Sequence, residues 1–184
     1  MRYASIRELD VSNGEGVGVA LFVQGCPFSP HCYNCFNTET WDFNGGKEFT
    51  SKIKNEFIEL IKRPYIKRVS ILGGEPLADQ NLDGVLNLVN EIRVLFPKKT
   101  IWLYTGYTWE ECNILMKGLD KYCMTYNQNN KKRQQIISMC DVLIDGRYID
   151  SKRDISLKWR GSSNQMVIDV QKTLQIGEIV LHCD

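Results

Sequence analysis

Residues 17–35 read VGVALFVQGCPFSPHCYNC, and this stretch decides how the rest of the chain is interpreted. Its first part, Val17 to Val23, is an almost unbroken apolar run, which is typical of a parallel strand buried on both faces. The strand leads to Cys26, and Cys32 and Cys35 follow shortly after it. The stretch therefore predicts a buried strand that delivers three thiol groups to one end of a sheet.

Further strands and helices are expected to alternate along the chain. We expect helices at 51–62, 82–96 and about 108–117, strands at 69–72, 100–104 and 142–144, and a polar surface loop at 127–135. This alternation predicts an α/β fold with a mostly parallel sheet. A complete eight-fold barrel usually takes about 250 residues, so a chain of 184 residues is expected to form a partial (β/α) barrel.

Size and composition narrow the possible functions. With 184 residues, of which 43% are hydrophobic, we expect a single domain over residues 1–184 with a substantial core. The formal net charge of +1 gives no support for nucleic-acid binding, which needs a basic surface. We see neither a signal peptide nor an apolar run approaching the roughly 20 residues of a membrane helix. We therefore expect a cytoplasmic protein with no nucleic-acid or membrane partner.

The cysteines favour a cluster-binding loop. Seven cysteines, an odd number, in a chain without a secretory signal favour free thiolates over disulfides. The close spacing of Cys26, Cys32 and Cys35 is typical of a loop that wraps thiolates around an iron–sulfur cluster. Three ligands would leave one iron of a four-iron, four-sulfur (4Fe–4S) cluster open to a reactant.

A structural zinc ion is the alternative at these cysteines. It needs a fourth protein ligand, for which His31 or a distant cysteine, Cys123 or Cys140, would be the candidate. Outside the motif, four cysteines are expected to be small buried residues without a chemical role: Cys112, Cys123, Cys140 and Cys183.

A second motif, Gly73-Gly74-Glu75-Pro76, follows directly after the apolar strand expected at 69–72. Two glycines at a strand end let the backbone approach a ligand without a side-chain clash, and Glu75 adds an acceptor for a cationic amine. The alternative is an ordinary turn between a strand and a helix. Together with the three cysteines, the motif indicates a radical enzyme that uses S-adenosylmethionine (SAM), whose methionyl amino group would meet this segment.

Two polar segments add little by themselves. Asn13 to Gly16 is expected to form a turn, and Arg160 to Gln165 a loop before a strand, although the second segment also offers a guanidinium, hydroxyls and amides to a ligand. Only two histidines, His31 and His182, are present, and no Ser-His-Asp arrangement is visible. We expect no catalytic residue beyond the cluster and SAM.

Taken together, these motifs resemble the activating proteins of anaerobic (class III) ribonucleotide reductases, within the radical-SAM superfamily, over nearly the full chain. The cysteine motif and the Gly-Gly-Glu-Pro motif mark the superfamily, whereas Tyr104 to Tyr107 and Arg160 to Gln165 point to this family. The other matching segments are Asn13-Gly14 with Gly16, Leu21 to Val23, Gly25-Cys26, Cys35 to Asn37, Thr40-Trp41, Ile101-Trp102 and Asp145-Gly146.

The resemblance implies a site and a reaction. The three cysteines Cys26, Cys32 and Cys35 would hold a 4Fe–4S cluster, with SAM bound at its open iron. Reductive cleavage of SAM would yield a 5′-deoxyadenosyl radical, which would take a hydrogen atom from one glycine of the reductase large subunit. The implied electron donor is flavodoxin or ferredoxin. The residues implied to bind SAM are Asn34, Cys35, Phe36, Gly73, Gly74, Glu75 and Pro76.

Three departures from the family pattern stand out. Five residues separate Cys26 from Cys32 here, where the family usually has three. Glu15 and Gly18 replace a usual proline and arginine, and loss of that arginine is expected to alter a charge near the site or the contact with the partner.

Two other functions stay open at this point. One is activation of a different glycyl-radical enzyme, of the formate-lyase type, although those activators tend to be longer and the segment from Arg160 to Gln165 argues against it. The other is a zinc-binding module without catalysis.

Overall fold

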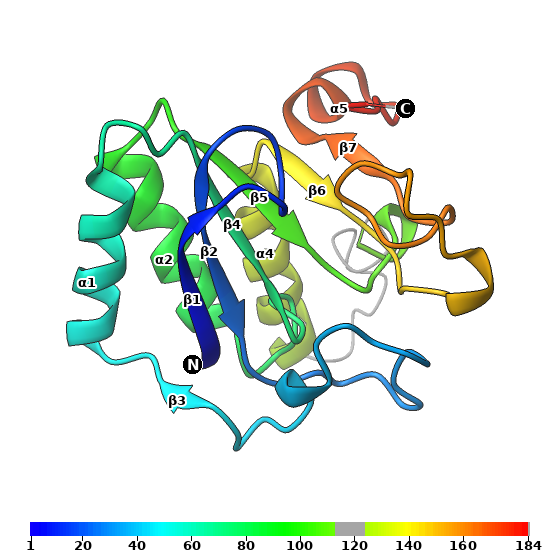
Figure 1. Ribbon diagram of the computed structural model, residues 1–184, viewed down its shortest axis with the longest axis horizontal. Helices are drawn as coiled ribbons and strands as arrows, with labels where there is room; N and C mark the ends of the chain where they lie inside the picture. Colours follow the sequence, from blue (N-terminus) through cyan, green and yellow to red (C-terminus); the bar gives the residue numbers. More distant parts are fainter. Residues whose placement is uncertain (113–123, 184) are drawn as a thin grey trace.

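The computed structural model describes residues 1–112 and 124–183, and a seven-stranded sheet forms its centre (Figure 1). The strand order is β3-β1-β2-β4-β5-β6-β7, so the sheet is open, with β3 and β7 at its edges. The four parallel strands in the middle are β2 (Gly18–Val23), β4 (Arg68–Gly73), β5 (Thr100–Tyr104) and β6 (Val142–Ile144). The antiparallel strands around them are β1 (Arg2–Asp10), β3 (Lys47–Glu48) and β7 (Val167–Asp169). The predicted α/β fold is confirmed, with a sheet that is parallel only in its centre.

The helices follow the predicted pattern in the first half of the chain. The described helices are α1 (Ser51–Lys62), α2 (Leu82–Leu95), α4 (Met124–Ser138) and α5 (Val170–Ile176), with short 3₁₀ turns η1 (Thr38–Thr40) and η2 (Asp150–Lys152). Thr50 caps α1, because its hydroxyl accepts a hydrogen bond from the Ile53 amide. Within the described ranges, no helix is long and apolar enough to cross a membrane.

The helix expected from Thr108 begins as predicted. Thr108 and Glu111 form a reciprocal cap, in which the Thr108 hydroxyl accepts from the Glu111 amide and the Glu111 carboxylate accepts from the Thr108 amide. Residues 109–112 are helical, and the rest of the expected helix lies outside the described residues.

The two faces of the sheet differ in what covers them. Alternate strand residues such as Leu21, Ile71 and Leu103 join the main core with side chains from the helices, and α2 and α4 lie behind the sheet in Figure 1. On the opposite face, Phe22 and Trp102 belong to two small apolar clusters that contain no described helix residue. This helix-free face is where a ligand can reach the strands.

The prediction of a polar loop at 127–135 is wrong, because these residues belong to helix α4. The helix could not be recognised from an apolar pattern, because Asn130 and Arg133 occupy buried positions although they are polar. Arg133 donates hydrogen bonds to the Leu77 carbonyl and the Asn130 side chain, each 3.0 Å long, and pairs with Asp79. A buried arginine satisfied in this way replaces the apolar stripe by which an amphipathic helix is usually found.

Replacing Arg133 by methionine is expected to lower the free energy of unfolding by about 2 kcal/mol, because the Leu77 carbonyl and the Asn130 side chain lose a charged donor. The matched control is Lys131→Met on an exposed position of the same helix, which should change stability by less than about 0.5 kcal/mol. Urea unfolding of the reconstituted protein measures both. Equal stabilities of the two variants would contradict the role given to Arg133.

Candidate cluster and SAM site

All three motif cysteines line one cavity of about 140 Å³, here called the cluster pocket. The pocket also includes Gly73, Gly74 and Glu75. Its walls come from segments that follow the C-terminal ends of β2, β4, β5 and β6, the edge at which parallel α/β sheets bind ligands. The three cysteines and the Gly73 to Glu75 part of the turn therefore line the same cavity.

The long loop between Cys26 and Cys32 is folded onto the rest of the site. The Cys26 amide donates to the Trp41 carbonyl at 3.0 Å, which fixes the start of the loop. The Phe28 ring then lies 5.0 Å from the Tyr107 ring and equally far from the Arg147 guanidinium. The two extra residues in this spacing therefore do not stop Cys32 from reaching the same pocket as Cys26.

The three thiols suit a cluster better than a single ion. They face one cavity, yet among the described residues no three His, Cys, Asp or Glu side chains come together closely enough to hold one metal ion. A cluster of several atoms does not need its thiolates to converge on a point. Burial raises the pKa of Cys26 to about 11, and the Glu75 carboxylate adds to the rise. Binding of iron would convert this thiol to the thiolate form, which is the form that coordinates iron.

Two of the three candidates for a fourth zinc ligand, Cys140 and His31, do not line the cluster pocket. The Cys140 thiol is fully buried in the main core, where it donates to the Ile136 carbonyl, and the His31 ring stacks on Trp41 at 4.1 Å. Cys112 is likewise buried in the core, as predicted, and Cys183 is half-buried. Cys123 lies outside the described residues.

The buried side chain of Glu75 links two of the turns that form the site. Its side chain is only 1% exposed. One carboxylate oxygen accepts from the Leu77 amide and the Thr105 hydroxyl, and the other accepts from the Gly106 amide at 2.7 Å. Burial raises the pKa of Glu75 to about 7, and the hydrogen bonds from Gly106, Leu77 and Thr105 limit the rise. The carboxylate therefore joins the turn after β4 to the turn after β5.

The structure gives a different reason for a glycine at position 74 than the sequence did. A Cβ atom at this position would lie 2.2 Å from the carbonyl oxygen of Gly25, the residue before Cys26. The Gly74 amide also donates to the Val23 carbonyl, and the Glu75 amide donates to Gly25. The glycine is required by close backbone packing between the two motifs, whereas the sequence alone suggested only space for a ligand.

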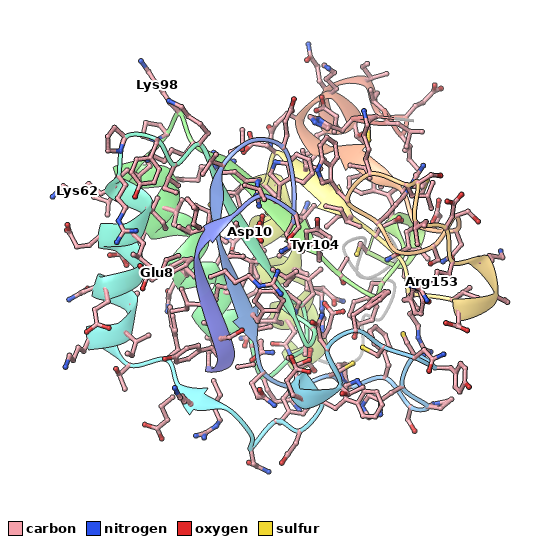
Figure 2. The ribbon with its side chains drawn as sticks, in the orientation of Figure 1. Glu8, Asp10, Lys62, Lys98, Tyr104 and Arg153 are labelled. Atoms are coloured by element: carbon pink, nitrogen blue, oxygen red, sulfur yellow. The ribbon has the colours of Figure 1, made fainter. Side chains whose placement is uncertain are left out.

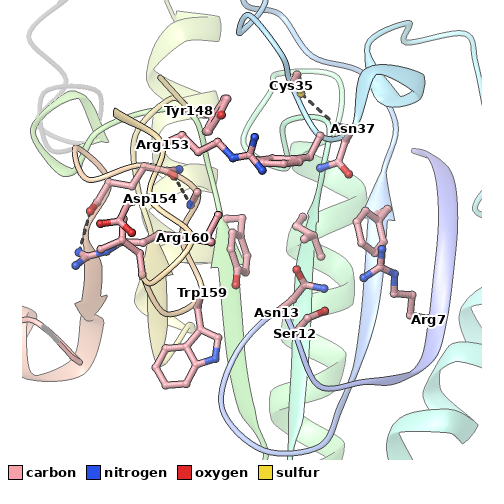
Figure 3. Close-up of a pocket in the computed structure, with 18 residues that line it drawn as sticks. Arg7, Ser12, Asn13, Cys35, Asn37, Tyr148, Arg153, Asp154, Trp159 and Arg160 are labelled. Carbon is pink, nitrogen blue, oxygen red and sulfur yellow. Dashed lines mark hydrogen bonds between the residues drawn. The ribbon is translucent and has the colours of Figure 1, made fainter. Parts of the chain in front are cut away.

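A larger groove of about 720 Å³ continues from the cluster pocket along the helix-free face (Figure 3). Arg7, Ser12 and Asn13 line one side of it, and Figure 3 shows Arg153 and Arg160 on the other. The groove shares five polar or aromatic residues with the cluster pocket: Cys35, Asn37, Tyr104, Tyr148 and Gln165. The two cavities therefore form one continuous site.

Two buried polar atoms in the groove have no hydrogen-bond partner within the described part of the chain. They are the Tyr104 hydroxyl and Nε of Arg160. Tyr104 lies near Asp10 in the centre of the molecule (Figure 2), and burial raises the pKa of its hydroxyl. Unpaired buried donors of this kind are costly, so the groove is chemically suited to a ligand that carries hydrogen-bond acceptors.

The expected SAM residues divide into two groups. Gly73, Gly74, Glu75 and Cys35 line the cluster pocket, and Phe36 lines the groove beside it. Asn34 and Pro76 line neither cavity, because Asn34 is exposed on the surface and Pro76 is buried in its turn.

Sequence reasoning missed Arg147, the one lysine or arginine among the described residues that line the cluster pocket. It also gave no site role to Thr105 and Gly106, which line the pocket after β5. Their position in the sequence was the available signal, because each of these residues lies within three residues of the end of a parallel strand, at the edge where ligands bind.

Comparison with known proteins decides the family. Residues 12–168 match the model of the 4Fe-4S single cluster domain. The chain is 36% identical to the anaerobic ribonucleoside-triphosphate reductase-activating protein of Escherichia coli, over 91% of this chain and 97% of that protein. The chain belongs to this family of activating proteins. Identity to family members from Vibrio cholerae and Pasteurella multocida is 35% and 34%, over 91% of this chain and 97% and 96% of those proteins.

Stability is expected to fall as the pH rises through the range set by Glu75. Because the pKa is about 7 in the folded protein and 4.5 ordinarily, the folded state binds the proton more tightly between these values. The free energy of unfolding should therefore decrease from pH 4.5 to 7, by on the order of 2–3 kcal/mol. Glu75→Gln should remove this decrease, whereas Glu59→Gln on the exposed face of α1 should keep it. An unchanged slope in Glu75→Gln would refute the assignment.

Gly74→Ala is expected to lower the iron content after anaerobic reconstitution, because the added methyl group pushes on the Gly25 carbonyl and displaces Cys26. Gly177→Ala is the control, since a Cβ there meets no atom within 4 Å. The control should cost about 1–2 kcal/mol of stability from its left-handed backbone and keep its iron. Wild-type iron content in Gly74→Ala would contradict the packing argument.

Proposed function

We propose that this protein is a radical-SAM activase that installs a glycyl radical on the anaerobic ribonucleoside-triphosphate reductase. One observation carries the proposal: a pocket with three thiols opens, beside the Gly-Gly-Glu-Pro turn, into a groove on a helix-free face. Membership in a family whose named proteins activate that reductase supplies the target.

Cys26, Cys32 and Cys35 are proposed to hold the 4Fe–4S cluster of the family's single-cluster domain. When bound and reduced, such a cluster would supply the one electron needed to cleave the C5′–S bond of SAM, and this chemistry would provide the radical that takes a hydrogen atom from a glycine Cα of the reductase. The protein's own task is to orient the reactants and limit the access of water.

The charges and shape of the pocket suit the two ends of SAM. Arg147 is proposed to bind the SAM carboxylate, because it is the cation of the pocket. The backbone of Gly73 and Gly74 would face the methionyl amine, with Glu75 as a positioning residue whose carboxylate is already engaged by Thr105 and Gly106. Phe36 would contact the adenosyl part from the groove.

The fold leaves room for a protein substrate. We interpret the open sheet as a partial (β/α) barrel of the radical-SAM type, formed by one domain that spans residues 1–184. A barrel that does not close leaves the groove accessible from the side, which suits a glycine presented on a segment of another protein. The proposed electron donor is flavodoxin or ferredoxin, and the proposed compartment is the cytoplasm, where such reductants are available.

The first test is the electron paramagnetic resonance (EPR) spectrum of the reconstituted, reduced protein with and without SAM, followed by addition of the reductase. We expect a 4Fe–4S signal that changes with SAM, and then a glycyl radical on the reductase. Cys32→Ala should abolish SAM cleavage. Cys183→Ala, which lines neither cavity, should cleave SAM within about twofold of wild type.

Each part of the proposal can fail separately. A radical on a formate-lyase type partner but none on the reductase would select the other activase function. Zinc without iron after anaerobic purification would support the zinc-binding module. SAM cleavage by Cys32→Ala at the wild-type rate would show that the longer loop does not supply a ligand.

A further inference from the structure

A buried ion pair lies under the edge of the groove and has no part in the proposed chemistry. Arg68 at the start of β4 is fully buried, and its guanidinium lies 2.8 Å from the carboxylate of Asp10, the last residue of β1. Burial alone would raise the pKa of Asp10, but hydrogen bonds from Arg68 and Asn13 outweigh it and hold the pKa below its ordinary value. The pair is therefore charged and desolvated, which is costly unless its other hydrogen bonds are met.

The remaining hydrogen bonds of Arg68 go to the turn between β1 and β2. Its guanidinium donates to the backbone carbonyls of Asp10, Asn13 and Glu15, at 2.9, 2.6 and 3.2 Å. The Ser70 hydroxyl, which Arg68 also contacts, donates to the same Asn13 carbonyl. One side chain thus fixes three successive points along the turn.

Asp10 holds the same turn from its other end. Its carboxylate accepts from the Asn13 amide at 3.0 Å, from the Asn13 side chain at 2.7 Å and from the Ser12 hydroxyl at 3.3 Å. The guanidinium of Arg7 lies 3.7 Å from the same carboxylate. The residues that Asp10 holds, Arg7, Ser12 and Asn13, are the ones that form one side of the groove (Figure 3).

Neither member of the pair lines a cavity. Arg68 and Asp10 are absent from the walls of both the cluster pocket and the groove, so neither would touch the cluster or SAM. Their contacts reach the groove through Arg7 and through the backbone and side chains of residues 12–15. These contacts act on function through the position of that wall.

We propose that Arg68, together with Asp10, is a positioning residue for the protein substrate: it fixes the Ser12–Asn13 wall of the groove against which the glycine-bearing segment of the partner lies. This inference rests on the proposed function and deepens it. It separates two properties of the site, because cleavage of SAM depends on the cluster pocket and capture of the partner depends on the wall that Arg68 holds.

The test compares Arg68→Met with wild type in two assays on the reconstituted protein. One measures SAM cleavage without the reductase, and the other measures the glycyl radical formed at varied reductase concentration. We expect uncoupled cleavage within about twofold of wild type and a rise of roughly tenfold or more in the apparent KM for the reductase. Arg63→Met, which breaks a partly exposed pair with Glu8, is the matched control and should change neither value.

A second variant separates positioning from stability. Arg68→Met leaves the buried Asp10 carboxylate with only the more distant guanidinium of Arg7 beside it. The double variant Asp10→Asn/Arg68→Met removes both charges of the buried pair and should recover most of the lost stability. Its apparent KM should stay high, because the Glu15 carbonyl then lacks its donor and the Asn13 carbonyl keeps only the Ser70 hydroxyl. Recovery of activation in step with stability would overturn the proposal, as would unchanged activation by Arg68→Met or a parallel loss of uncoupled SAM cleavage. If wild type itself forms no radical on the reductase, the proposed function fails instead.

Discussion

The site depends on one buried residue, Glu75, whose side chain and amide link the segments that follow three strands. The Glu75 side chain binds the turn after β5 through Thr105 and Gly106, while its amide binds the Gly25 carbonyl at the end of β2. A carboxylate in this position would be strongly unfavourable without donors, and the backbone amides of Leu77 and Gly106 provide them. Glu75 therefore contacts three segments of the site: the start of the cysteine loop, the double-glycine turn and the turn after β5. Hydrogen bonds within the protein fix their relative positions, and fixed positions are a condition for precise orientation of a reactive intermediate.

The two faces of the sheet are covered differently, and this difference determines what surrounds the site. Helices cover one face with aliphatic side chains, and the main core lies there. The other face carries aromatic and charged side chains, among them Tyr104, Trp159 and Arg160, and remains accessible as a groove. A sheet closed into a complete barrel would enclose this face. The open edges at β3 and β7 leave it accessible to a substrate too large to enter a closed cavity.

Sequence patterns predicted the parts of the molecule whose side chains follow a simple period. Helix α1 and strands β5 and β6 have the predicted bounds, because apolar runs and helical stripes report burial directly. Helix α4 was missed because it buries the polar side chains of Asn130 and Arg133. Strand β1 was not predicted because most of its residues are exposed or half-buried, so it has no apolar run. The three cysteines and the double glycine were found from spacing alone. The roles of Glu75 and Arg147 needed the fold, because what each contacts is remote in the chain.

The register of β2 against β4 places Gly18 beside a large side chain of the neighbouring strand. Gly18 is the partner of Arg68 in this parallel pair, and a Cβ atom on residue 18 would lie 2.8 Å from the guanidinium carbon of Arg68. There is room for one large side chain at this point, and here the neighbouring strand supplies it. A large side chain at residue 18 would therefore displace Arg68 and, with it, the turn between β1 and β2 that Arg68 holds, so residues 18 and 68 constrain each other.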